Sequence, residues 1–92
     1  MLTMMLSTYT GSMRLALAGN VRAKAVPEID RFIKYGKQIK QRVALDLGEV
    51  TLIDPPVVQF LAEQLKRGVE LVNCPAYIVH WILREATDES ET

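Results

Sequence analysis

Residues 42–56 read RVALDLGEVTLIDPP, and this stretch decides the fold that the sequence predicts. Residues 43–47 are a short run that favours a β-strand, and the extended pattern continues from Glu49 to Ile53 beyond Gly48. Two prolines follow Asp54, and proline suits the first turn of a helix because the N–H groups there lack intrahelical partners. The stretch therefore predicts a strand that turns directly into a helix, with Asp54 at the N-cap.

The segment that follows has the spacing of an amphipathic helix over residues 55–67. Gly68 comes directly after two basic residues, an arrangement that is typical of a helix C-terminus. Phe60 falls off the predicted apolar stripe, together with Val57 and Gln64. The stripe that we expect to face the core consists of Val58, Leu61, Ala62 and Leu65.

The rest of the chain supplies a hairpin before this unit and a strand and helix after it. The turn signal Thr10-Gly11-Ser12 separates the two strands of the hairpin. Strands that alternate with helices after a hairpin predict a ββαβαβα order and a mixed sheet. The remaining predicted elements are strands at residues 2–9, 13–18 and 69–72, a helix at 24–40 and a last helix opened by Asn73-Cys74-Pro75.

Length and composition predict one cytoplasmic domain. We expect residues 1–86 of the 92 to form it and residues 87–92 to form a disordered acidic tail. Basic and acidic residues each number 11, which argues against non-specific nucleic-acid binding. The lone Cys74 predicts no intramolecular disulfide. The N-terminus lacks the pattern of a signal peptide, and no apolar run reaches the roughly 20 residues of a membrane helix.

The sequence offers no catalytic constellation, so we expect no enzyme activity and no cofactor or metal. The five glycines form no phosphate-binding loop. With one histidine and one cysteine, the chain lacks the set of residues that most nucleophilic mechanisms require. His80 has no partner at ligand spacing and is interpreted as a structural residue. Cys74 is interpreted as a small buried residue, with a reactive thiol at the helix start as the alternative.

The run from Arg42 to Asp54 resembles the centre of a STAS domain, the module of sulfate transporters and anti-sigma factor antagonists. The Asp46-Leu47 pair, the step Leu52-Ile53-Asp54 into a helix, and the later strand at Gly68 stand in the order of that family. Leu15 to Gly19 is similar to the family's Leu-x-Gly strand end, so the resemblance covers about residues 13–84. It implies a mixed four-stranded sheet with helices packed mainly on one face, and it implies no enzyme activity.

The chain departs from the family at the position that carries the family's switch. In STAS antagonists a kinase phosphorylates a serine at the second position after the aspartate, and here that position is Pro56. Pro55 occupies the first position and Val57 replaces the family's glycine, so none of the three carries a hydroxyl. We therefore expect no phosphorylation switch at the usual site.

The candidate partner-binding residues surround this turn. For Asp54 the alternative is a helix cap alone, and for the two prolines it is simple helix initiation. Phe60 either forms a protein contact or tucks against a neighbouring element. The predicted surface comprises Asn20, Val21, Asp54, Pro55, Pro56, Val57 and Phe60.

Three functional hypotheses follow. The first is a non-enzymatic, STAS-like interaction module in bacterial regulation that binds an anti-sigma factor or a related kinase. The second is an accessory subunit of a lipid-transport ATPase complex, and neighbouring genes would separate it from the first. The third is a small-ligand or nucleotide-binding domain.

Residues 1–9 also predict an uncharged edge strand, which suggests a homodimer.

Overall fold

The predicted ββαβαβα order is confirmed. The computed structural model describes residues 2–91, with side chains described through residue 85. The four strands form one sheet in the order β1-β2-β3-β4, in which β1 and β2 are antiparallel and the other pairs are parallel. The elements are β1 (Leu2–Tyr9), β2 (Ser12–Val21), the 3₁₀ helix η1 (Ala23–Ala25), α1 (Val26–Gln38), β3 (Arg42–Ile53), α2 (Pro55–Lys66), β4 (Glu70–Val72) and α3 (Ala76–Glu91).

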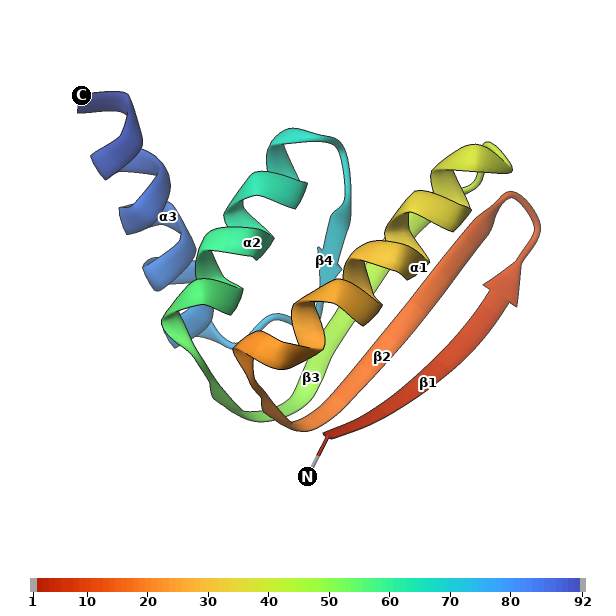
Figure 1. Ribbon diagram of the computed structural model, residues 1–92, viewed down its shortest axis with the longest axis horizontal. Coiled ribbons are helices and arrows are strands. Elements are labelled where there is room, and N and C mark those ends of the chain that lie inside the picture. Colours follow the sequence, from red (N-terminus) through yellow and green to blue (C-terminus); the bar gives the residue numbers. More distant parts are fainter. Residues whose placement is uncertain (1, 92) are drawn as a thin grey trace.

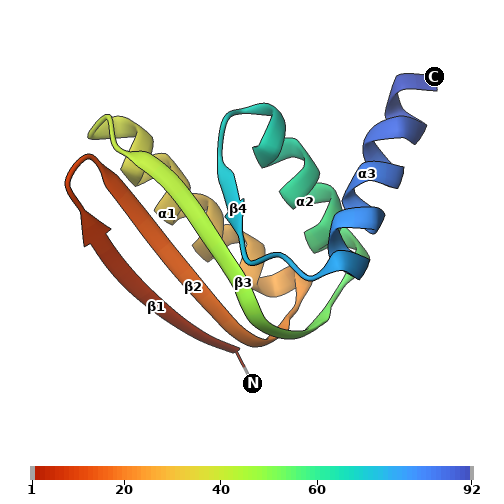
Figure 2. The same ribbon diagram turned by 180° about the vertical axis from the view of Figure 1, so that it is seen from behind.

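The helices lie on one face of the sheet. Figures 1 and 2 show α1 and α2 over this face, with α3 beside α2 beyond β4. Within residues 2–91 no helix covers the opposite face. The alternation along β2 produces this arrangement, because Met13, Leu15 and Leu17 are buried while the residues between them are only half-buried.

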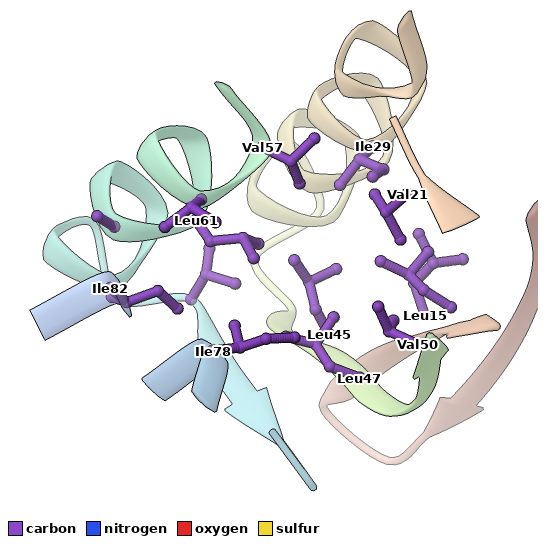
Figure 3. Packing of buried hydrophobic residues seen from close by; sticks show 14 of the residues in the cluster. Leu15, Val21, Ile29, Leu45, Leu47, Val50, Val57, Leu61, Ile78 and Ile82 are labelled. Atoms are coloured by element: carbon purple, nitrogen blue, oxygen red, sulfur yellow. The ribbon is translucent and has the colours of Figure 1, made fainter. Parts of the chain in front are cut away.

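One hydrophobic core joins the sheet to all three helices (Figure 3). Leu45, in the middle of β3, is fully buried, as are Ile29 of α1, Leu61 of α2 and Ile78 of α3. Complete burial of one such side chain contributes about 1.5–3 kcal/mol. The core therefore includes α3 as well as the central strands.

The predicted stripe of α2 is partly wrong. Leu65 is 41% exposed, whereas Gln64 is only 3% exposed and Val57 is fully buried. Val58, Leu61 and Ala62 of the predicted stripe are buried, as expected. Val57 and Gln64 are buried beside them, so the inner face of α2 is wider than predicted on this side and does not extend to Leu65. The reason is tertiary, because α2 packs against α3 and η1 as well as against the sheet.

The break at Gly48 is a bulge inside one continuous strand. Ala16 pairs with Asp46 and Ala18 pairs with Glu49, so β3 has one extra residue at this point. The Asp46 carboxylate accepts a hydrogen bond from the Gly48 N–H at 3.0 Å. The Asn73 side-chain amide lies 3.3 Å from the same carboxylate, which ties the end of β4 to the bulge.

Helix α3 overlaps the segment for which a disordered tail is predicted. Its assigned bounds reach Glu91, so residues 87–91 belong to the helix. The side chains of residues 86–92 lie outside the described part of the chain, and the acidic tail at 87–92 stays a prediction.

Two helices end in the same hydrogen-bonding motif with different residues at its left-handed position. After α2 the Gly68 N–H donates to the Leu65 carbonyl, and after α1 the Lys40 N–H donates to the Lys37 carbonyl. Gly68 has φ 92° and Lys40 has φ 58°. Only glycine adopts this conformation without a penalty from Cβ, so Lys40 is held at an energetic cost.

Replacing Lys40 with glycine is therefore expected to stabilise the protein. After allowance for the entropy of glycine in the unfolded chain, the gain in unfolding free energy is about 0.5–1 kcal/mol. Urea denaturation measures it, and Lys40→Ala is the control because it removes the same charge but keeps Cβ. Equal stability of the glycine and alanine variants would contradict the assignment of strain to Lys40.

Candidate functional site

The candidate site lies where β2 and β3 end together. The last residue pair of these two parallel strands is Val21 with Ile53. The chain then enters η1 from β2 and α2 from β3, so the starts of two helical segments meet at one edge of the sheet (Figure 1). Asp54 is the single residue between β3 and α2, as the sequence predicts.

Asp54 holds this edge together, but its side chain does not cap α2. Its backbone is extended, as expected at an N-cap, yet its carboxylate accepts a hydrogen bond from the Ala23 N–H at 2.9 Å. The Pro56 at the second helical position has no N–H to offer, and the Val57 N–H donates to the Asp54 carbonyl at 2.9 Å. The side chain is therefore available to reach across to η1.

A second hydrogen bond fixes the same two segments. The Asp54 N–H donates to the Val21 carbonyl at 3.1 Å, so the backbone of Asp54 binds the end of β2 while its side chain binds the start of η1. The Asp54 carbonyl also accepts a hydrogen bond from the Val58 N–H at 3.2 Å. A turn held at both ends in this way presents its outward side chains in a fixed arrangement, which reduces the entropy that binding would cost.

Pro55 and Pro56 are exposed at this turn, and Phe60 is half-buried one helical turn further on. Phe60 packs against the edge of the core, which corresponds to the tucked alternative for this residue. Part of its ring remains accessible beside the prolines. The exposed surface at this turn is therefore apolar, rigid and small.

Two residues of the predicted surface are not accessible. Val21 is 1% exposed and Val57 is fully buried, and both point into the core with Ile29 (Figure 3). Val57 is buried because the inner face of α2 is wide enough to include it, and Val21 is buried because it faces the helices at the last pair of β2 and β3. The prediction that these two side chains contact a partner is wrong.

Asn20 remains at the site, and its side chain has a hydrogen-bond partner that the sequence did not indicate. The Thr51 hydroxyl donates a hydrogen bond to the Asn20 side-chain oxygen at 3.1 Å. A second register shift in β3 accompanies this contact, because Gly19 pairs with Val50 while Asn20 pairs with Leu52. Thr51 and Ala23 were missed because pairing register and backbone contacts between distant segments leave no local sequence pattern.

The other candidate chemical groups stand apart from this turn. Cys74 is half-buried, and burial raises the pKa of its thiol, which opposes formation of a reactive thiolate at neutral pH. His80 is exposed on α3.

Within the described residues no three His, Cys, Asp or Glu side chains gather in a way that could hold a metal ion. None of the described helices has the length and apolar character needed to cross a membrane.

No family model matches the chain, and no curated protein matches it. The fold class is that of an α/β domain with a mixed four-stranded sheet.

Proposed function

We propose that this chain is a non-enzymatic, STAS-like protein-interaction module that acts in the cytoplasm in bacterial regulation. Its partner is an anti-sigma factor or a related regulatory kinase, which binds the surface formed by Asn20, Asp54, Pro55, Pro56 and Phe60. We call this surface the Asp54 turn surface. Val21 and Val57 are excluded from it because they are buried.

The observation that carries this proposal is the attachment of Asp54 to both the end of β2 and the start of η1. The Ala23 N–H binds the carboxylate at 2.9 Å and the Asp54 N–H binds the Val21 carbonyl at 3.1 Å. The turn that these bonds hold carries the two exposed prolines. In the sequence resemblance to STAS domains, Pro56 stands at the position of the phosphorylated serine. A preorganised turn suits recognition by a protein, because little conformational freedom is lost on binding.

The two prolines also define how the interaction is regulated. Pro55 and Pro56 have no hydroxyl group, so no kinase can place a phosphate on either residue. Phosphorylation of these two residues therefore cannot switch binding through the Asp54 turn surface on or off. Control of the complex then depends on the abundance of the two proteins or on the partner.

Replacing Pro56 with glutamate is expected to abolish partner recovery in a pull-down. A carboxylate at the second helical position is compatible with the helix dipole, so the fold should be retained while the apolar surface gains a charge. Gln38→Glu is the matched control, because it adds the same charge at an exposed position on a different helix, at the C-terminal end of α1. Equal recovery by both variants and the wild type, with unchanged circular dichroism, would remove the Asp54 turn surface from consideration.

We further propose that the chain forms a homodimer through β1. This strand pairs with β2 without interruption from Leu2 to Tyr9 and contains no charged residue, proline or glycine. Met5 is 65% exposed and Leu6 is 54% exposed on it. The opposite edge strand, β4, has only three residues and begins with Glu70. Charge and shortness protect that edge from pairing, whereas β1 has neither protection.

A further inference from the structure

A pocket lies at the same end of the sheet, on the β1 side of the Asp54 turn surface. It has a volume of about 430 Å³ and is lined by Leu2, Asn20, Arg22, Lys24 and Ala25. This volume falls within the range of about 300–1,000 Å³ that is usual for small-molecule sites. The pocket is separate from the two exposed prolines, and of the proposed partner surface it includes only Asn20.

Two positive charges line this pocket without a negative partner. Arg22 and Lys24 are both exposed, and among the described residues neither forms an ion pair. No carboxylate is among the residues that line the pocket, and the Asp54 carboxylate accepts a hydrogen bond from the Ala23 N–H. The two cations therefore stand on either side of Ala23 with their charges uncompensated within the pocket.

Asn20 adds a neutral donor that is already oriented. The Thr51 hydroxyl donates a hydrogen bond to the Asn20 side-chain oxygen at 3.1 Å, and this contact does not use the two donors of the Asn20 amide NH₂. The guanidinium of Arg22 and the ammonium of Lys24 are also donors without acceptor capacity. All three polar side chains in the pocket thus supply hydrogen-bond donors, and the ligand must supply acceptors.

We propose that this pocket binds an organic phosphate monoester. A monoester carries about −1.5 to −2 charges at neutral pH, which matches the two cations, and its three terminal oxygens match the three donors. The apolar side chains of Leu2 and Ala25 form the rest of the wall and would contact the organic part. This inference does not depend on the proposed protein partner, because the ligand is a small molecule.

Phenyl phosphate is a suitable probe, and binding is measured by titration into the ¹⁵N-labelled protein with detection of amide shifts. We expect saturable shifts at residues 20–25 and an affinity at least about tenfold higher than that of inorganic phosphate, because the ring adds apolar contact. The double variant Arg22→Ala/Lys24→Ala should weaken binding by at least about tenfold, because it removes two charge-assisted donors.

Arg31→Ala/Lys40→Ala is the matched control, since it removes one Arg and one Lys at exposed positions of α1 and the turn after it. It should bind phenyl phosphate as the wild type does. Lys24→Gln gives a second, milder test that removes the charge but keeps a polar side chain, and it should weaken binding by less than the double variant does. Equal responses to phenyl phosphate and inorganic phosphate would overturn the monoester assignment. Unchanged affinity in the Arg22/Lys24 variant, or no saturable shift at all, would overturn the site.

Discussion

Gly36→Ala is expected to lower the free energy of unfolding by about 1–3 kcal/mol, the usual cost of overpacking a core. Gly36 is buried in α1, where the helix lies against β3. A Cβ at this position would meet the Val43 Cγ2 at 2.5 Å and the Met13 sulfur at 3.5 Å. Val43 is β-branched and 4% exposed, so it has little room to turn away. The contact should outweigh the gain of up to about 1 kcal/mol that alanine brings to a helix.

A double-mutant cycle assigns this loss to the Val43 contact. Val43→Ala removes Cγ2 and should by itself destabilise the protein by creating a cavity. In that background Gly36→Ala should cost less than in the wild type, and the coupling energy should favour the double variant. Thermal or urea unfolding of the four proteins provides the measurement. Strictly additive effects would mean that the loss in Gly36→Ala does not come from contact with Val43.

Met5→Lys is expected to convert the proposed dimer to a monomer. Antiparallel pairing of β1 with β1 of a second copy would place Met5, which lies in the middle of the strand, close to the twofold axis. Two lysines would then face each other across the interface, and charge on an edge strand is a common protection against pairing. Light scattering coupled to size exclusion should give half the mass of the wild type.

Tyr35→Lys is the control for this substitution. Tyr35 is 56% exposed on α1, so the change introduces the same side chain at a similarly exposed apolar position away from β1. It should leave the mass unchanged. Circular dichroism of Met5→Lys should match the wild type, because Met5 is largely exposed and contributes little to the core. A wild-type protein that remains monomeric at high concentration would contradict the β1 interface.

The fold was accessible from the sequence because its signals are local. The Asp54-Pro55-Pro56 step, the Gly11 turn and the Gly68 helix end each depend on a residue whose backbone preference determines the structure around it. The mixed sheet, with an antiparallel hairpin and parallel crossovers, followed from these boundaries and from general rules of connection. The bulge at Gly48 was visible only as a break in the pattern, because its pairing depends on β2.

The site was predicted less completely, because burial on α2 depends on what surrounds the helix. Val57 was expected at the surface, and it is buried because α2 is enclosed on more sides than one apolar stripe suggests. The hydrogen bond from the Ala23 N–H to the Asp54 carboxylate joins residues 31 positions apart. A local sequence pattern does not predict a contact between such distant residues. The proximity of Arg22 and Lys24 to Leu2 likewise requires the paired hairpin.

Hydrogen–deuterium exchange of the chain with and without its recovered partner tests binding at the Asp54 turn surface most directly. The partner for this measurement is the protein that the wild type recovers and that Pro56→Glu does not. The proposed surface predicts slower exchange on binding at the amides of residues 20–24 and 57–60, with β4 and α3 unchanged. Protection confined to β4 and α3, with the amides around Asp54 unaffected, would contradict it.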